Sequence, residues 1–412
     1  MTEPPTPQLR QCVILAGGMG TRLGARTTTV PKPILPVGDR PFLAWLLREL
    51  QRYGFTEALL LCGHLGQALQ SGMDGITARL PKPMRIVFSH EATPLGTAGA
   101  LVNARALLDD RFLLCNGDSL TDGSLAPLLA QAAADRPEVL GRLLLHDVPD
   151  VARYGTIATE GDEITAFRPA GEAAGPGAIS AGIGVFMRGI VDHLPPAGSL
   201  EHDVLPGLAA SGRLRATSGT GMFIDIGTPP DLRRAQTQIP SRLRRPALVL
   251  DRDGVINVDH GYVGDIGRFE FTPSARAAVA LAGAAGWHVF IASNQSGIAR
   301  GLYTEAAVAR LHAWLQDRML AAGGTIDDIR ICPTHPDATV AAYARASDWR
   351  KPGPGMLLDL VRAWELDPAR CIMVGDQQTD MAAAAAAGMR GHLFPGGDLA
   401  AFVSPLVAGP AA

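Results

Sequence analysis

Two stretches of the sequence have the same design: CVILAGGMGTRL at residues 12–23 and ALVLDRDGVIN at residues 247–257. Each begins with a short apolar run and turns abruptly to glycine and charged residues. Such a run predicts a buried strand that enters a loop at its carboxyl end. We therefore expect one α/β sheet to begin near the start of the chain and a second one past its middle.

Strand and helix patterns alternate after both stretches, which predicts parallel strand pairing and two doubly wound α/β domains. Apolar runs predict strands at residues 12–16, 58–62, 112–115, 247–250, 288–292 and 371–374. Helical periodicity or helix-favouring composition predicts helices at residues 42–53, 230–236, 274–285, 305–322 and 382–387. The halves share this rhythm but no motifs, so we find no internal repeat.

A polar, basic segment with two prolines separates the two patterns: TQIPSRLRRP, residues 237–246. This composition is typical of a linker between domains. We assign residues 1–237 to a first domain, 238–246 to the linker and 247–412 to a second domain.

The bulk composition is that of an ordinary globular protein: 47% of the 412 residues are apolar, 19% are charged, and the formal net charge is −3. This balance gives no reason to expect a nucleic-acid or membrane partner, and no apolar run is long enough to span a bilayer. The polar residues 1–11 lack the apolar core of a secretory signal. A cytoplasmic location is therefore expected, and a homo-oligomer is compatible with these numbers. Scattered cysteines without a CxxC pair predict reduced, buried thiols: Cys12, Cys62, Cys115, Cys332 and Cys371.

Phosphate-binding groups follow the first predicted strand. The loop GGMG at 17–20 offers backbone N–H groups that can approach phosphate oxygens. Arg22 adds a guanidinium, and Lys32 lies between two prolines that limit where its ammonium can point. Asp118 and Asp225 each follow an apolar strand, and carboxylates at that edge of a sheet could hold Mg²⁺ against a triphosphate.

Residues 10–237 resemble the sugar-1-phosphate nucleotidyltransferases, which implies a Rossmann-like fold for this half. The similarity lies in seven stretches that occur in the family's order: GGMGTRL (17–23), VPKPILPVGDRPFLAWLLREL (30–50), PLGTAGAL (94–101), NGDS (116–119), RYG (153–155), SAGIGVF (180–186) and FIDIGTPPDL (223–232). The resemblance implies that a sugar 1-phosphate attacks the α-phosphate of a nucleoside triphosphate and releases pyrophosphate.

The same resemblance implies roles for individual residues. Arg22 and Lys32 would stabilise the phosphates, and Asp118 and Asp225 would bind Mg²⁺. The implied nucleotide-binding residues are Leu15, Ala16, Gly17, Gly18, Gly20, Thr21 and Gly96, and the implied sugar-phosphate contacts are Gly155 and Arg168.

Two positions depart from the family pattern. Phe167-Arg168 stands where many members have Glu-Lys, which keeps the positive charge but removes a carboxylate, and Ser180 stands where asparagine is common. Among relatives, the pattern is most similar to the heptose 1-phosphate and mannose 1-phosphate guanylyltransferases. Guanine as the base is implied by this resemblance alone.

Two aspartates, Asp251 and Asp253, follow the strand predicted at residues 247–250, which begins the second domain. Phosphoryl transfer to a carboxylate needs a nucleophile and a second acid, which protonates the leaving group and later activates water. Two anions this close to a phosphate also need a cation, so Mg²⁺ is implied. Further groups that could serve this site follow other predicted strands or lie in loops: Asp376, Ser293, Asn294 and Lys351.

Residues 247–395 resemble the haloacid dehalogenase (HAD) superfamily, and within it the heptose 1,7-bisphosphate and histidinol phosphatases. The matching stretches are DRDGVINVDHGYV (251–263), SNQSGIARG (293–301), WRKPGPGML (349–357) and VGDQQTDM (374–381). The resemblance implies a HAD-like fold without a large cap, with Asp251 as nucleophile and Asp253 as general acid/base. It places Mg²⁺ on Asp251, the Asp253 carbonyl and Asp376. The transferring phosphate would be held by Ser293, Asn294 and Lys351, and the substrate by Arg350.

Relatives in this branch often carry a structural zinc bound by cysteine and histidine. Here the matching segments supply Cys332 and His335, while SDW at 347–349 replaces the later cysteine pair. One cysteine and one histidine cannot complete a tetrahedral site, so we expect no zinc.

Together the two resemblances predict a bifunctional enzyme. The C-terminal domain would remove the 7-phosphate from D-glycero-D-manno-heptose 1,7-bisphosphate, and the N-terminal domain would join the resulting heptose 1-phosphate to GTP. One alternative is a mannose 1-phosphate guanylyltransferase fused to a histidinol-phosphate or other small-molecule phosphatase. Another is that one half serves only as a binding or oligomerisation module, against which the two complete sets of acids and cations argue.

Overall fold

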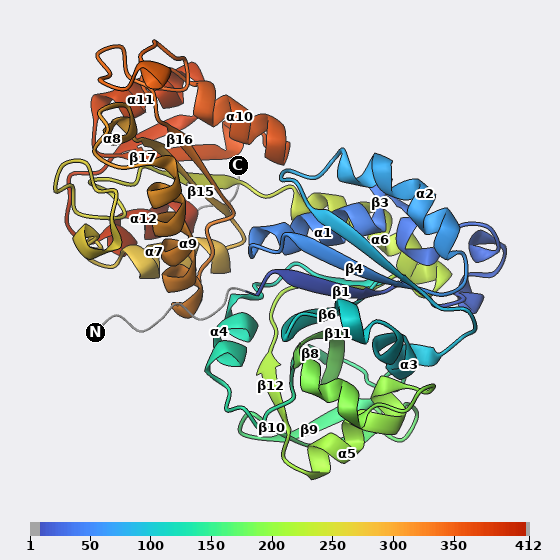
Figure 1. Cartoon of the computed structure of the whole chain (residues 1–412). Helices are drawn as coiled ribbons and strands as arrows, with labels where there is room; N and C mark the ends of the chain where they lie inside the picture. The colour runs from blue at the N-terminus through green and yellow to red at the C-terminus, as the bar shows by residue number, and fades with distance from the viewer. Residues whose placement is uncertain (1–8, 409–412) are drawn as a thin grey trace. The chain divides into compact units, whose positions relative to one another are not determined.

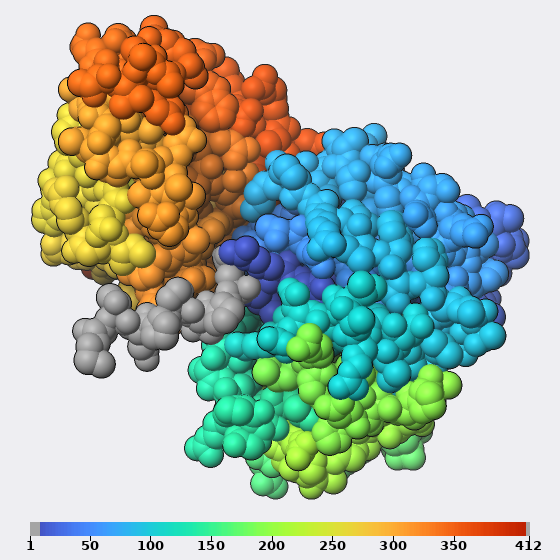
Figure 2. Space-filling view, viewed as in Figure 1, coloured from blue at the N-terminus to red at the C-terminus, as the bar shows by residue number. Residues whose placement is uncertain are grey.

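The computed structural model describes residues 9–408, drawn as a ribbon in Figure 1 and as a space-filling view in Figure 2. The described residues form two compact units, the first ending at Leu243 and the second beginning at Arg244. Each unit is an α/β domain, as the alternating pattern predicts. None of the helices within 9–408 is both long and apolar enough to cross a bilayer.

A nine-stranded mixed sheet forms the centre of the first unit (Figure 1). β1 (Gln11–Leu15) lies between β4 (Glu57–Cys62) and β6 (Arg111–Asn116) and pairs in parallel with both. The predicted parallel pairing is therefore confirmed for the three apolar runs of this half. β5 (Arg85–His90) extends the sheet beyond β4, and beyond β6 follow, in sheet order, β11 (Gly177–Met187), β8 (Gly141–Val148), β12 (Leu214–Ser218), β10 (Glu163–Arg168) and β9 (Thr156–Glu160).

The part of this sheet beyond β6 differs from the prediction. β11 runs antiparallel to both β6 and β8, and β10 runs antiparallel to β12 and β9. The sequence analysis predicts none of these added strands. β9 and β10 keep one face toward solvent, so their apolar pattern is weak.

Helices close the core of the first unit. α1 (Phe42–Arg52) buries residues along its whole length, and α3 (Gly96–Asn103) and α5 (Leu205–Ala210) pack apolar residues against the central strands. The other helices of the unit are α2 (Gly66–Thr77), α4 (Ala126–Ala134) and α6 (Pro229–Leu243).

Helix α6 continues past its predicted end at residue 236 and includes residues 238–243, which the sequence analysis assigns to a linker. Ile239 and Leu243 are fully buried and hold these last turns against the unit. Pro240 lies inside the helix and packs against the turn at Gly38, where an added Cβ would come 2.5 Å from the Pro240 ring. The proline obscured the helical pattern, and the connection between the units is shorter than predicted.

Two short antiparallel ribbons shape the loops of the first unit. β7 (Ser119–Thr121) pairs with β13 (Phe223–Asp225), which places Asp225 opposite Ser119. Asp118, directly before β7, is thereby brought beside Asp225 although the two are far apart in sequence. The second ribbon joins β2 (Pro36–Val37) and β3 (Arg40–Pro41).

A five-stranded parallel sheet forms the second unit. The strands, in sheet order, are β16 (Asp328–Cys332), β15 (His288–Asn294), β14 (Ala247–Leu250), β17 (Cys371–Gly375) and β18 (Arg390–Leu393). The helices are α7 (Ala275–Ala284), α8 (Ser296–Ala299), α9 (Glu305–Ala321), α10 (Gly355–Trp364), α11 (Gln378–Ala386) and α12 (Leu399–Val407).

Helices cover both faces of this sheet. In β14, Leu248 and Leu250 face a core that includes α7, α9 and α12, whereas Ala247 and Val249 face a core that includes α10 and α11. This arrangement confirms the doubly wound prediction.

All five cysteines are buried and free, as predicted. Burial raises the pKa of Cys12, Cys62 and Cys371 to about 12, so these thiols stay protonated. Buried protonated thiols are poor nucleophiles and metal ligands, which leaves them a packing role.

Candidate active sites

The glycine loop after β1 borders a cavity of about 400 Å³ in the first unit. Gly17 lies against Gly63, where an added Cβ would come 2.9 Å from the Gly63 nitrogen, so the close approach requires glycine. Lys32 and Asp118 also line this cavity. The predicted nucleotide-binding residues that line this cavity are Leu15, Ala16, Gly17, Gly18 and Gly96.

Gly20 and Thr21, also predicted to bind nucleotide, do not line this cavity. Gly20 has a φ of 61° and starts the 3-10 helix at Thr21–Thr27. Its carbonyl accepts a hydrogen bond from Oγ1 of Thr27 at 2.9 Å. The structure thus gives Gly20 a turn-forming position, and a phosphate contact from either residue stays a prediction.

A buried lysine lies between two aspartates at the carboxyl edge of the sheet. Lys32 is only 8% exposed, forms an ion pair with Oδ2 of Asp118 and lies 3.5 Å from Oδ1 of Asp225. Burial, and then the charge of Asp118, raise the pKa of Asp225, while Lys32 opposes them. Lys32 and the nearby Arg22 together balance the two carboxylates, whose oxygens are still the hard donors that suit Mg²⁺.

Gly227 marks the point where Arg22 joins this cluster. A Cβ at Gly227 would lie 2.8 Å from Oδ1 of Asp225, 3.0 Å from Nζ of Lys32 and 3.1 Å from Nη2 of Arg22. A side chain here would fill the space among the three charged groups. Arg22, Lys32, Asp118 and Asp225 therefore gather around one space, as the sequence predicts.

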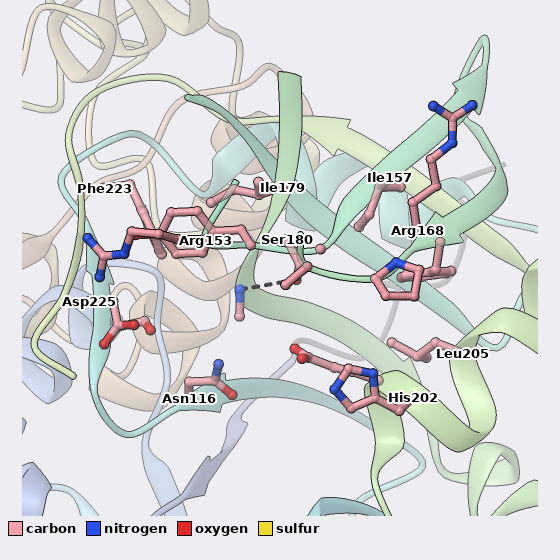
Figure 3. A pocket seen from close by; sticks show the side chains of 18 of the residues that line it. Asn116, Arg153, Ile157, Arg168, Ile179, Ser180, His202, Leu205, Phe223 and Asp225 are labelled. Atoms are coloured by element: carbon pink, nitrogen blue, oxygen red, sulfur yellow. Dashed lines mark hydrogen bonds between the residues drawn. The ribbon is translucent and has the colours of Figure 1, made fainter. Parts of the chain in front are cut away.

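A second cavity, of about 450 Å³, begins at Arg22 and Asp225. Figure 3 shows Arg153 and Asp225 at one end, with Arg168 and His202 at the other. Gly155 and Arg168, the predicted sugar-phosphate contacts, both line it. Asn116 lines both this cavity and the one beside the glycine loop, so the two spaces adjoin at the end of β6.

Glu201 brings a carboxylate to the second cavity, which Phe167 also lines. The side chain is exposed, yet the surrounding protein partly desolvates its carboxyl and raises the pKa of Glu201. The sequence analysis missed this residue because it lies in a single π-helical turn, Leu200–Val204, outside the stretches that carry the resemblance.

In the second unit, a lysine again bridges two aspartates. Asp251 directly follows β14, and its Oδ2 lies 2.8 Å from Nζ of Lys351, which lies 2.6 Å from Oδ1 of Asp380. Burial raises the pKa of Asp251 to about 6, with Lys351 opposing this shift. Burial also lowers the pKa of Lys351, but the two carboxylates outweigh that effect and raise it, so the lysine stays charged.

Three carboxylates of this site are close enough to share one metal ion: Asp251, Asp376 and Asp380 have oxygens within 4.8 Å of one another. Oδ1 of Asp376 is buried and has no hydrogen-bond partner within residues 9–408. A buried oxygen without a hydrogen-bond partner destabilises the folded state unless a ligand binds to it. Hard oxygen donors of this kind suit Mg²⁺. The acidic groups therefore fit the predicted ion, and Asp380, which the sequence analysis did not assign, adds a neighbouring carboxylate that pairs with Lys351.

The predicted phosphate-binding residues lie beside Asp251, but Asn294 differs from its expected use. Its Nδ2 donates to the Lys351 carbonyl and its Oδ1 accepts from the Lys351 N–H, both at 3.1 Å. The side chain thus fixes the backbone that carries the lysine, and these two bonds use only one of the two Nδ2 hydrogens. Arg350 keeps a buried Nη1 without a partner among the described residues.

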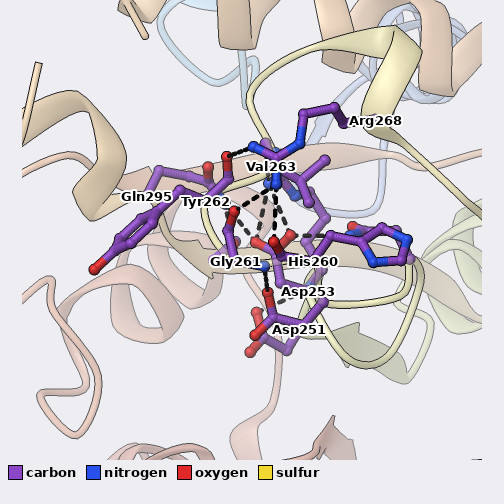
Figure 4. A network of polar contacts seen from close by, with 12 residues as sticks. Asp251, Asp253, His260, Gly261, Tyr262, Val263, Arg268 and Gln295 are labelled. Carbon is purple, nitrogen blue, oxygen red and sulfur yellow. Dashed lines mark hydrogen bonds and ion pairs between the residues drawn. The ribbon is translucent and has the colours of Figure 1, made fainter. Parts of the chain in front are cut away.

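Asp253 is held on several sides. Nη2 of the buried Arg252 lies 2.9 Å from both carboxylate oxygens, and Asn257 donates to Oδ1 at 3.0 Å. Gln295 donates to Oδ2 at 2.8 Å. Figure 4 shows Asp253 and Gln295 within one polar network that also includes Val263 and Gly261.

The residues considered for zinc lie at the end of β16, which contains Cys332, and in the loop that follows it, which contains His335. Sγ of Cys332 lies 3.3 Å from Oγ1 of Thr334, and Nδ1 of His335 accepts a hydrogen bond from the Asp337 N–H. Both groups thus have partners within their own loop. The absence of zinc stays a prediction.

Two family models match the chain: nucleotidyl transferase at residues 11–242 and HAD-hydrolase-like at residues 348–401. The first match covers more than half of the chain.

Curated relatives are similar to part of the chain. The D-glycero-β-D-manno-heptose-1,7-bisphosphate 7-phosphatase of Rhodopseudomonas palustris is 47% identical over 164 residues, which are 40% of this chain and 91% of that protein. The protein of the same name from Escherichia coli K12 is 44% identical over 142 residues, or 34% of this chain and 74% of that protein. Among solved structures, HddC from Yersinia pseudotuberculosis is 28% identical and covers 55% of this chain and 98% of its own, with a TM-score of 0.48.

Proposed function

Because the chain belongs to the nucleotidyl transferase family through residues 11–242, and to the family of the heptose 1,7-bisphosphate 7-phosphatases, we propose that it is a bifunctional enzyme of heptose activation. Its second unit hydrolyses the 7-phosphate of D-glycero-D-manno-heptose 1,7-bisphosphate. Its first unit transfers a nucleotidyl group, GMP from GTP, to heptose 1-phosphate. Nucleotides and phosphorylated sugars are cytoplasmic metabolites, so we place the protein in the cytoplasm.

The observation that carries this proposal is the chemical relation between the two sites. Removing the phosphate at carbon 7 leaves the phosphate at carbon 1 in place. A sugar 1-phosphate is the acceptor that sugar nucleotidyltransferases use, so the product of one site is the substrate class of the other. The choice of guanine rests on sequence resemblance to the heptose and mannose 1-phosphate guanylyltransferases.

In the second unit, the Asp251 carboxylate attacks the phosphorus, and a bond to Asp251 forms while the bond to the sugar oxygen breaks. Asp253 protonates that oxygen as it leaves. The ionised Asp253 then takes a proton from a water molecule that attacks the aspartyl-phosphate, which releases orthophosphate and restores Asp251. Lys351, 2.8 Å from Asp251, orients the nucleophile, and Ser293 can donate its hydroxyl proton to a phosphate oxygen.

In the first unit, an oxygen of the sugar 1-phosphate attacks the α-phosphorus of the triphosphate. The bond between the α- and β-phosphates breaks, and pyrophosphate leaves. Here the protein acts by positioning and by charge. Lys32 and Arg22 approach the developing negative charge, and the N–H groups of the glycine loop face the phosphates.

Mg²⁺ fits the acidic groups of both sites. Asp118 and Asp225 would hold it in the first unit, and Asp251, Asp376 and the Asp253 carbonyl in the second. When bound, the ion neutralises phosphate charge and polarises the reacting phosphoryl group.

The direct test incubates the purified chain with Mg²⁺, each nucleoside triphosphate and a panel of sugar phosphates, and follows orthophosphate and pyrophosphate separately. The panel holds both anomers of heptose 1,7-bisphosphate and heptose 1-phosphate, with mannose 1-phosphate and histidinol phosphate as competitors. We expect heptose substrates and GTP to give the highest kcat/KM. A preference for mannose 1-phosphate and histidinol phosphate would favour the alternative enzyme pair instead.

Two substitutions assign the activities to their sites. Asp251→Asn should abolish orthophosphate release while pyrophosphate release from heptose 1-phosphate continues, and Asp118→Asn should do the reverse. If neither substitution changes either activity, the residue assignments are wrong.

A further inference from the structure

The Asp253 network contains two residues to which the reaction above gives no role: Gln295 and Tyr303. Gln295 follows β15 and is 1% exposed. Its Nε2 donates to Oδ2 of Asp253 and to Oγ of Ser293, both at 2.8 Å. One side-chain amide thus joins the proposed general acid/base to the serine proposed to bind the phosphate.

The orientation of this amide is set by Tyr303, whose hydroxyl donates to Oε1 of Gln295 at 2.9 Å. Burial raises the pKa of Tyr303 to about 12, so the hydroxyl keeps its proton and acts as a donor. If the amide were reversed, Oε1 would face the Asp253 carboxylate, and two acceptors would meet. The tyrosine therefore keeps the donor end of Gln295 toward Asp253.

The fold holds the Tyr303 ring in a slot between two glycines. A Cβ added at Gly264 would come within 2.1 Å of a ring atom, and one at Gly297 within 2.3 Å. Neither position has room for a side chain while the ring is in place. Gly264 lies in the loop that follows Asp253, and Gly297 lies in α8, which follows β15. The ring is therefore fixed relative to both of the segments that supply residues to the site.

The contact with Gln295 also limits the direction in which the Ser293 hydroxyl can donate its own hydrogen. Its oxygen accepts the Gln295 N–H, so its own hydroxyl hydrogen is left to point elsewhere and can be donated to a phosphate oxygen. Gln295 also approaches Asp253 at Oδ2, whereas Asn257 binds Oδ1. The amide is thus the contact that ties the Asp253 carboxyl to the strand end carrying the phosphate-binding serine.

We propose that Gln295 and Tyr303 are positioning residues that hold the Asp253 carboxyl where it can protonate the leaving oxygen. This inference rests on the proposed phosphatase reaction. It predicts a dependence on the leaving group, because an alcohol leaves only with a proton, whereas an aryl oxygen such as that of 4-nitrophenyl phosphate leaves as a stable anion. A displaced Asp253 should therefore slow the sugar phosphate much more than the aryl phosphate.

The experiment compares kcat/KM for heptose 1,7-bisphosphate and 4-nitrophenyl phosphate in the full chain with Mg²⁺ and without nucleotide. Since kcat/KM reports the steps up to transfer of the phosphate to Asp251, the shared hydrolysis of the aspartyl-phosphate does not affect the comparison. Tyr303→Phe should lower the value about tenfold for the sugar phosphate and less than about twofold for the aryl phosphate, part of the roughly 10²–10⁴-fold that general acid catalysis supplies. Tyr343→Phe, which removes a hydroxyl that faces Glu305 in the same unit, is the matched control.

Gln295→Met removes the donor and keeps the side-chain length, so it repeats the test if Tyr303→Phe does not fold. Equal losses on both substrates in these variants would mean general damage and would overturn the inference. Asp253→Asn tests the general-acid role of Asp253 separately from its positioning by Gln295 and Tyr303. A leaving-group dependence in Asp253→Asn but not in the Gln295 and Tyr303 variants overturns the positioning role alone. If Asp253→Asn shows no leaving-group dependence, both the proposed general acid and the positioning role are wrong.

Discussion

Replacing Asp251 with asparagine should change how the stability of the second unit depends on pH when Mg²⁺ is removed with EDTA. Burial raises the pKa of Asp251 from 3.8 to about 6, with Lys351 offsetting only part of the effect. One pKa unit corresponds to about 1.4 kcal/mol, so ionising Asp251 costs about 3 kcal/mol more in the folded protein than in the unfolded chain.

The sign follows from where the proton binds more tightly. A raised pKa means that the folded state holds the proton better, so this contribution to stability is complete below about pH 4 and is lost as the pH rises through about 6. Asparagine cannot ionise, so the variant loses no unfolding free energy from this position over the same pH range. Between about pH 4 and pH 7, Asp251→Asn should therefore gain about 3 kcal/mol of unfolding free energy relative to the wild type.

Urea unfolding followed by tryptophan fluorescence measures this difference, because every tryptophan except Trp45 lies in the second unit. Asp337→Asn, which removes an aspartate side chain that is 87% exposed, is the matched control and should show no such trend. A constant difference between Asp251→Asn and the wild type across the pH range would refute the assigned burial cost. Added Mg²⁺ should stabilise the wild type more than the Asp251 variant.

Two further substitutions test the charged clusters. Lys32→Met should lower pyrophosphate release by about 10²-fold or more, because removing one electrostatic contact to a developing charge lowers the rate by about that factor. Orthophosphate release in the same reaction mixture should stay unchanged. Asp376→Asn should raise the Mg²⁺ concentration needed for half-maximal orthophosphate release at least about tenfold, since it replaces a proposed ligand. An unchanged magnesium requirement would exclude Asp376 from the metal site.

The strands that the sequence predicts are those buried on both faces. β14 and β17 alternate residues between two apolar cores, so every position is apolar and the run is easy to recognise. The edge strands β16 and β18 carry charged or exposed residues, and β9 and β10 of the first sheet are largely exposed. Exposure leaves a weaker apolar pattern, so the sequence does not predict these four strands. β8 and β11 are mostly buried, but charged residues in β8 and glycines in β11 interrupt their apolar runs.

The residues at the strand ends could be placed from sequence because parallel pairing brings the carboxyl ends of strands to one edge. This logic explains why Asp251 and Asp376 meet. It does not explain the ion pair of Lys32 with Asp118, because Lys32 lies in a short 3-10 helix, Lys32–Ile34, and not at a strand end. Nor does it give the direction of a side chain. Asn294 was expected to face the phosphate, yet its amide binds the Lys351 backbone, a contact set by a distant loop.

The two units have different sheets but use the same electrostatic arrangement. In each, a nearly buried lysine contacts two aspartates: Lys32 with Asp118 and Asp225, and Lys351 with Asp251 and Asp380. A lysine buried with one carboxylate would form a closed, neutral pair with little attraction for a metal ion. A second carboxylate adds an oxygen donor for Mg²⁺, while the ammonium remains beside the phosphate that the ion binds. In the second unit Asp376 makes the cluster net negative, whereas in the first unit Arg22 balances the second carboxylate. The geometry thus matches a reaction in which negative charge moves between phosphate oxygens, and it explains why two different sheets bear the same three groups at their carboxyl edges.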